Sequence, residues 1–219
     1  MINHIKIGFL LLIMSTILIS CSDNRKKYWE NGNLQSELNY KNDKLNGLAT
    51  WYFENGNKEQ EVFYIENVIN GKLIRWYQNG IYESISNYTN GQLDGQALVY
   101  DNFGMVISEE NYVNDSLSGK YTLWHSSGKI KIKGSYDHGY FSGRWIYYNQ
   151  IGEIIGTGNY KRGNGLQKAW YPNGSIMREI YYVNNLKHGS EKWYNAEGQL
   201  ENIIYYNEGN VVDRNSDIP

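Results

Sequence analysis

A glycine recurs at a nearly constant interval along almost the whole chain, and this repeat constrains the fold more than any other feature. The interval is 24 residues except for one of 22, at Gly32, Gly56, Gly80, Gly104, Gly128, Gly152, Gly174 and Gly198. An aromatic residue stands four positions before each glycine, in the first aromatic column: Tyr28, Tyr52, Trp76, Tyr100, Trp124, Tyr148, Trp170 and Tyr194. A tyrosine stands eight positions after each glycine, in the tyrosine column: Tyr40, Tyr64, Tyr88, Tyr112, Tyr136, Tyr160, Tyr182 and Tyr206. Because periods of this length mark repeat architectures, the chain is predicted to form eight tandem units in one elongated domain.

The turn residues indicate that each unit is strand, turn, strand, turn. The seventh unit reads Tyr171-Pro172-Asn173-Gly174, which predicts a type I turn closed by a glycine at positive φ, the three-residue hairpin loop. A second glycine closes the first seven units, at Gly47, Gly71, Gly95, Gly119, Gly143, Gly165 and Gly189, and the eighth has Asp213 there. Residues that tolerate positive φ stand four positions earlier, at Asp43, Asn67, Gly91, Asp115, Gly139 and Asn185. A second turn is therefore expected between consecutive hairpins.

The hairpin register pairs each residue of the first aromatic column with the residue two after the glycine. The predicted pairs are Tyr28–Leu34, Tyr52–Lys58, Trp76–Tyr82, Tyr100–Val106, Trp124–Ile130, Tyr148–Ile154, Trp170–Ile176 and Tyr194–Leu200. All but Tyr52–Lys58 join an aromatic to an apolar or aromatic residue, which predicts one continuous packed stripe on one face of a sheet.

Among the aromatics outside the two columns, five are predicted to project to the opposite face: Trp51, Tyr121, Trp145, Tyr147 and Trp193. Partly exposed Trp and Tyr are typical of interface hot spots, so these five are candidate binding residues. The alternative is that they pack against neighbouring strands.

The sixth unit is shorter than the others by two residues between Tyr160 and Gly165. A slip of one residue would turn every side chain of a strand to the other face, whereas the loss of two keeps its faces in phase. We therefore expect a two-residue deletion in the loop of this unit.

Composition and charge favour an all-β protein and argue against nucleic-acid binding. The chain has 21 Tyr, 7 Trp and 23 Gly but only 2 Pro, which favours strands and turns. The net charge is −2, and Lys and Arg are scattered one or two per unit, often beside Glu, without the basic face of a nucleic-acid binder.

The N-terminus indicates export and lipidation. Lys6 precedes an apolar run over residues 7–19, the length of a signal-peptide core. The run ends Leu18-Ile19-Ser20-Cys21, which resembles a bacterial lipobox, and Cys21 is the only cysteine of the chain. Ser22 after the cysteine favours the outer over the inner membrane, by resemblance to lipoprotein sorting. The alternative is an ordinary signal peptide or anchor helix with an incidental cysteine.

The repeat, aromatic-x-x-x-Gly, then a tyrosine eight residues on, then a loop ending in Gly, resembles the variant MORN repeat, including the YwqK-like antitoxins. This resemblance, over about residues 28 to 210, implies an elongated, single-layer twisted antiparallel sheet of eight tandem β-hairpins, whose sixteen strands would span about 75 Å. The expected divisions are a signal peptide at 1–20, a lipidated tether at 21–27, the repeat domain at 28–213 and a polar tail at 214–219.

No pattern indicates catalysis, a metal or a cofactor. His125, His138 and His188 have no second His, Cys or carboxylate at metal-ligand spacing. Glu59 with Glu61, or Glu109 with Glu110, could suggest glycoside hydrolysis, but Glu37, Glu83, Glu179 and Glu201 occupy the same columns in other units. An acid that recurs through an array is typical of a solvated face.

We therefore expect a non-enzymatic, lipid-anchored envelope protein that binds an unidentified protein partner, with an antitoxin- or immunity-like role among the possibilities. Two alternatives remain open, binding to envelope polysaccharide or peptidoglycan and binding to a phospholipid surface.

Overall fold

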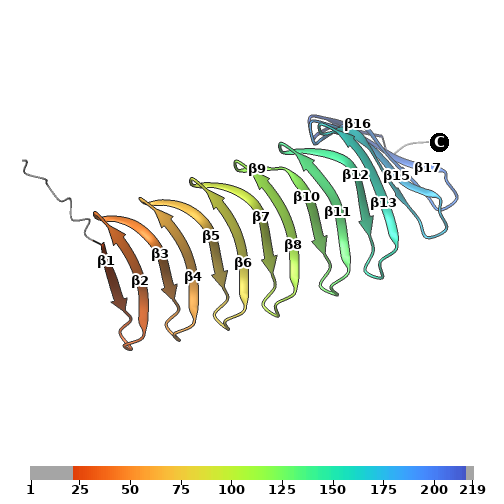
Figure 1. Ribbon diagram of the computed structural model, residues 1–219. Helices are drawn as coiled ribbons and strands as arrows, with labels where there is room; N and C mark the ends of the chain where they lie inside the picture. The colour runs from red at the N-terminus through yellow and green to blue at the C-terminus, as the bar shows by residue number, and fades with distance from the viewer. Residues whose placement is uncertain (1–21, 216–219) are drawn as a thin grey trace, which may run out of the picture.

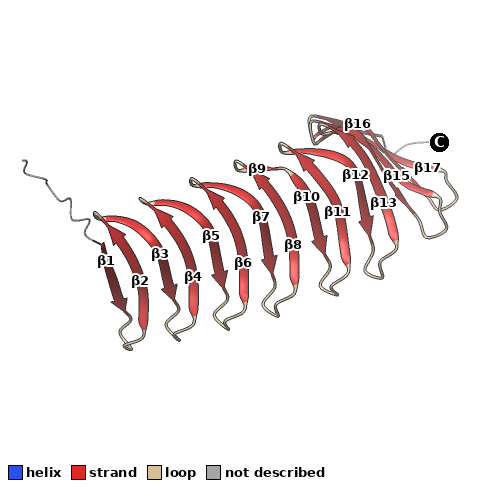
Figure 2. Ribbon diagram, in the orientation of Figure 1, coloured by secondary structure: helices blue, strands red, loops and turns tan. Residues whose placement is uncertain are grey.

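The computed structural model describes residues 22–215, which form one open antiparallel sheet without helices (Figures 1 and 2). The strands are β1 (Ser22–Tyr28), β2 (Leu34–Lys41), β3 (Lys44–Tyr52), β4 (Lys58–Ile65), β5 (Val68–Trp76), β6 (Tyr82–Thr89), β7 (Gln92–Tyr100), β8 (Val106–Val113), β9 (Ser116–Leu117), β10 (Gly119–Trp124), β11 (Ile130–Asp137), β12 (Tyr140–Tyr148), β13 (Ile154–Lys161), β14 (Asn164–Trp170), β15 (Ile176–Val183), β16 (Leu186–Tyr194), β17 (Leu200–Asn207) and β18 (Asn210–Asn215). Figure 1 shows the hairpins side by side in a row as far as β13, after which the strands lie across one another in this view. The predicted fold class is confirmed.

The first turn of each unit has the predicted chemistry. All eight repeat glycines have positive φ, from 78° at Gly128 to 94° at Gly152. Each donates its N–H to the carbonyl three residues earlier, as Gly174 does to Tyr171 at 2.9 Å. The eight predicted cross-strand pairs are all present, including Tyr52–Lys58 and Trp124–Ile130. Turn chemistry in the sequence therefore sets the hairpin register.

The second turn consists of two residues at positive φ, such as Asn42 at 52° and Asp43 at 59°. This is the turn type whose twist matches that of the flanking strands. The closing glycine of a unit then lies opposite the tyrosine of the next unit, as Gly47 opposite Tyr64 and Gly71 opposite Tyr88 show. A β-carbon added at Gly47, Gly95 or Gly119 would crowd an asparagine side chain of the neighbouring strand, Asn39, Asn87 or Asn111.

The short sixth unit corrects one prediction. The deletion lies outside the loop, because Arg162 and Gly163 still form a two-residue turn between β13 and β14. In most units a bulge interrupts the pairing of the two strands just before the second turn, as it does between β2 and β3. β13 instead pairs with β14 without a bulge, through Asn159–Leu166 and Tyr160–Gly165. The two lost residues are those of the bulge.

The ends of the sheet also differ from the predicted boundaries. Ser22–Lys27, predicted as part of a tether, belong to β1 and pair with β2 from Ser22–Lys41 onward. β18 adds a closing strand after the eighth hairpin and extends to Asn215, beyond the predicted limit at 213. The sheet therefore begins earlier than predicted and has an extra strand after the eighth hairpin. Residues 22–215 form more than the sixteen strands expected. Cys21 and residues 1–20 lie outside the described residues.

The sheet has two unequal faces, which the cross-strand pairs define. The inner face contains the row Leu38, Ala49, Val62 and Leu73 and, in the described chain, all the buried apolar side chains: Ala49, Val62, Leu73, Ala97, Trp145, Tyr160 and Ile180. The tyrosine column is on this face. The outer face contains the row Lys26, Glu37, Thr50 and Glu61 together with the first aromatic column. The packed side of this single layer is therefore the one opposite the first aromatic column.

Candidate functional site

Trp145, one of the five candidate binding residues, is part of the core. Its side chain is 3% exposed, stacked on Tyr121 with 5.5 Å between ring centroids and edge-on to Tyr136 and Phe141 at 5.1 and 4.8 Å. The indole N–H donates to the carbonyl of Ser135 at 3.1 Å. Trp145 does lie on the face opposite the first aromatic column, as predicted, but the prediction that it is a free binding residue is wrong because that face is the packed one.

Two glycines inside strands explain how Trp145 packs so closely. A β-carbon added at Gly134 would overlap the Trp145 ring, and one added at Gly158 would overlap the Tyr160 ring. Gly158 is also the direct cross-strand partner of Trp145. Neither glycine belongs to a turn column, so a glycine in mid-strand on either side of Trp145 was the sequence signal of its burial.

The other four candidates also lie on the inner face. Tyr121 and Tyr147 belong to the cluster around Trp145, where burial raises the pKa of both phenols and, together with Tyr121, raises the pKa of Tyr136 to about 12. Trp51 and Trp193 lie at opposite ends of the sheet and are partly buried. They do not join the other three in one surface.

A buried carboxylate near the C-terminal end had no counterpart in the predictions. Glu191 is 1% exposed and accepts from Lys187 at 3.0 and 3.1 Å, while Arg178 lies 3.4 Å away. The Arg178 guanidinium also donates to Gln167 at 3.1 Å and lies 5.3 Å from the centre of the Trp193 ring. Because a buried charge needs paired partners, this cluster is a closed structural network.

Most of the exposed apolar side chains of the strands lie on the outer face. Two cross-strand pairs stand out from it, Leu48 with Phe63 at 43 and 41% exposure and Leu166 with Tyr181 at 40 and 46%. A hollow of about 290 Å³ lies beside the second pair and is also lined by His188 and Lys192. Large apolar groups left exposed in contiguous places mark interaction sites.

The first aromatic column and its partners extend this surface along the hairpin ends. Tyr82 packs between Trp76 and Tyr100, with ring centroids 5.6 and 6.1 Å away. Its exposure is 45%, and Tyr28 and Ile154 are exposed by 58 and 51%. The predicted cross-strand pairs of the column are present, but the column is open to solvent at several positions.

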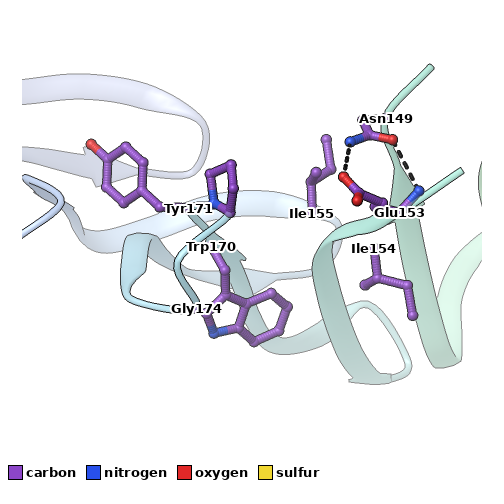
Figure 3. A pocket seen from close by; sticks show the side chains of 8 residues that line it. Asn149, Glu153, Ile154, Ile155, Trp170, Tyr171 and Gly174 are labelled. Carbon is purple, nitrogen blue, oxygen red and sulfur yellow. Dashed lines mark hydrogen bonds between the residues drawn. The ribbon is translucent and has the colours of Figure 1, made fainter. Parts of the chain in front are cut away.

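Slots open between neighbouring hairpin ends, where the inter-hairpin ladder stops. The slot between the sixth and seventh hairpins has a volume of about 420 Å³ and is lined by residues that include Asn149, Glu153, Ile154, Ile155 and Trp170 (Figure 3). Asn149 donates to the Glu153 carboxylate at 2.9 Å. An equivalent slot of about 420 Å³ lies between the second and third hairpins, at Arg75 and Trp76.

The residues beside each tip glycine decide whether a slot is bridged. In the second hairpin Asn55 and Asn57 donate to the carbonyl of Gln78 in the third, at 3.0 and 2.9 Å. The sixth hairpin has Ile151 and Glu153 at these positions. Neither can donate from its side chain, and no hydrogen bond between described residues joins the sixth tip to the seventh.

The titratable side chains have structural partners at dispersed places. His125 bonds the carbonyl of Tyr148 at 3.0 Å and His138 bonds Asp137 at 2.7 Å. Within residues 22–215 no three or more His, Cys, Asp and Glu side chains come together in a way that could hold a metal ion. The same residues contain no helix with the length and hydropathy of a membrane span.

A comparison with protein families agrees with this repeat geometry. A family model described as a MORN repeat variant matches residues 24–42, 45–66, 93–114, 117–138, 164–184 and 187–208, more than half of the chain. Each matched segment corresponds to one hairpin of the sheet, and the hairpins β5–β6 and β12–β13 lie between matches. No curated protein matches the chain.

Proposed function

The chain belongs to the MORN repeat variant family, and from this premise we propose that it is a non-catalytic scaffold whose outer face binds a protein partner. A repeat motif of this kind specifies a surface and leaves the function to the residues displayed on it. The observation that carries the proposal is the exposure of the pairs Leu48–Phe63 and Leu166–Tyr181 on the outer face. An immunity-like role, in which the partner is a toxin, is one form of the same proposal.

The outer face suits a protein partner better than the off-column aromatics suit a glycan. The glycan alternative relied on tryptophans that stack on sugars, and Trp145 is buried against four aromatic side chains of the inner face and donates to a backbone carbonyl. The outer face instead combines exposed apolar pairs with charged neighbours such as Lys168 and Glu179, which form an ion pair. Apolar anchors surrounded by polar groups are typical of protein interfaces.

The test is recovery of the partner from the native envelope. The lipidated protein is purified by affinity with its bound proteins, which are quantified by mass spectrometry for wild type and for the double variant Phe63→Ala, Tyr181→Ala. We expect recovery of the specific partner to fall about tenfold or more, because truncation of interface anchors costs ~2 kcal/mol or more. The control is Phe103→Ala, at a tip residue that is 81% exposed. Equal recovery with the double variant and the control would refute an outer-face interface.

We further propose that a lipid on Cys21 holds the scaffold at a membrane, with the outer membrane preferred. The support is the lipobox-like sequence before Cys21 and the start of β1 at Ser22, one residue after it. Acyl chains contribute about 0.8 kcal/mol per buried CH₂ to membrane anchoring.

Cys21→Ser is expected to remove the protein from the membrane fraction or to leave it as an uncleaved precursor. Fractionation and gel mobility of the variant, compared with wild type, measure this. A variant that fractionates and migrates as wild type does would refute lipidation at this residue.

A further inference from the structure

The slot between the sixth and seventh hairpins contains an acid without a cation. Glu153 is the one charged residue among those that line the slot. Its carboxylate accepts from Asn149 at 2.9 Å, and no ion pair between described residues includes it. Charge at this slot is therefore negative.

In the equivalent slot between the second and third hairpins the tryptophan already has a cation of the chain over its ring, and the slot is lined by Arg75 together with Glu59 and Glu83. Lys58 lies with its ammonium 5.4 Å from the centre of the Trp76 ring, and Arg75 lines the slot and donates to Gln60 at 3.1 Å. Counted from the tip glycines, Lys58 corresponds to Ile154 and Arg75 to Ala169, while Trp76 corresponds to Trp170. The sixth–seventh slot thus keeps the tryptophan, has neither cation, and has gained Glu153 where the other has Asn57.

From this comparison we propose that the sixth–seventh slot binds a cationic side chain, an arginine or lysine presented by the protein partner. In Figure 3 Ile154 and Trp170 extend to the same side of the slot, and Asn149 and Glu153 lie at the other end. An arginine or lysine has the same division, with an apolar stem and a charged head. The stem would contact Ile154 and the Trp170 ring, and the head would pair with Glu153.

The chemistry of the slot discriminates among occupants. An anionic group would meet the Glu153 carboxylate and no basic residue among the lining side chains. A guanidinium offers the carboxylate two parallel donors and stacks on an indole ring. This inference rests on the proposed function, because it specifies the chemistry of the partner at one point of the scaffold.

The test is a titration of the full chain with acetylated, amidated Gly-Arg-Gly and with the same peptide in which neutral citrulline replaces arginine. Binding is followed by the NMR shift of the Trp170 indole N–H, assigned from the spectrum of Trp170→Phe. We expect a saturable shift with the arginine peptide and at least tenfold weaker binding of the citrulline peptide. A neutral cello-oligosaccharide is titrated in parallel and is expected to cause no shift.

Two variants and a matched control make the test specific to the slot. Glu153→Gln should weaken binding three- to tenfold, the loss expected for one partly exposed charge-assisted contact. Ile154→Lys copies Lys58 and places the chain's own cation over Trp170, so it should abolish binding; Ile154 is 51% exposed and the change is compatible with folding. Glu59→Gln, in the other slot, should bind as wild type does.

Equal binding of the two peptides, an undiminished shift in Ile154→Lys, or a shift caused by the oligosaccharide would overturn the proposal. An equal loss in Glu59→Gln and Glu153→Gln would also overturn it, since the effect would then be general electrostatics. Failure here combined with retained capture of the partner by the outer face would refute the slot alone. The proposed function is tested separately, by the capture of a partner with wild type and with the outer-face double variant. The failure of the slot and the failure of the scaffold are therefore distinguishable.

Discussion

Replacement of Trp145 by alanine is expected to lower the free energy of unfolding by about 3–5 kcal/mol, the range for a buried aromatic. The indole is 3% exposed and packs against Tyr121, Tyr136 and Phe141. Its removal leaves a cavity between strands β10 and β13 that the surrounding rings cannot fill, because each is fixed to its own strand. Denaturant unfolding followed by circular dichroism measures the loss.

The matched controls are Trp51→Ala and Trp124→Ala. Trp51 lies on the same face at the other end of the sheet, is partly exposed, and has the polar strand partners Ser36 and Gln60. Trp124 belongs to the first aromatic column on the outer face and is also partly exposed. Each should cost about 1–2 kcal/mol. If Trp124→Ala proved as costly as Trp145→Ala, the outer face would have to be packed as well as the inner one.

Turn chemistry made the register predictable from the sequence. A glycine at positive φ after a type I turn leaves one way to pair the two strands, so the Trp124–Ile130 pair followed from the position of Gly128. The second turn was equally local, since Asp43 and its equivalents are residue types that adopt positive φ. The same turn residues recur in the eight units, so each unit supports the register predicted for the others.

Which face packs could not be predicted in the same way. Alternation along β12 places the side chains of Trp145 and Tyr148 on opposite faces of the sheet. Whether a face is buried, however, depends on the residues two strands away and on how the sheet curves. Gly134 and Gly158 make room for Trp145 and Tyr160, and their role is visible only once the strands are in register. The N-terminal boundary was missed for a related reason: Ser22–Lys27 are polar and exposed, and only their pairing with β2 makes them a strand.

The candidate site was beyond sequence reasoning because a slot exists only where neighbouring hairpin ends separate. The residues that give the slot its chemistry can nevertheless be found by comparing equivalent positions of the repeat. Ile154 replaces the lysine of Lys58 and Glu153 replaces the amide of Asn57, and such departures from a repeat are where individual units acquire function. The five aromatics predicted to bind instead pack on the inner face, whereas the residues that depart from the repeat, Glu153 and Ile154, lie at a hairpin end.

The substitution Gly165→Ala is expected to cost about 3 kcal/mol, at the upper end for overpacking, because the added β-carbon would overlap the backbone carbonyl of Asn159. Gly165 lies in the junction of β13 and β14, where the missing bulge brings the strands together through Tyr160–Gly165 and Asn159–Leu166. A backbone atom cannot rotate away as a side chain can. Relief therefore requires the strands to separate, and the loss should appear in the unfolding free energy and as faster amide exchange in β13 and β14.

Gly189→Ala is the control that separates this crowding from ordinary glycine strain. Gly189 closes the seventh unit at φ 75°, and a β-carbon added there would meet no atom within 4 Å, so the expected cost is only the ~1–2 kcal/mol of a left-handed conformation. Gly165→Ala should be the more damaging change although Gly165 is the one closing glycine without positive φ. If the two variants lost equal stability, the close approach of β13 and β14 would have no energetic consequence. The two-residue deletion would then be a neutral shortening, and glycine would not be required at this position by the lost bulge.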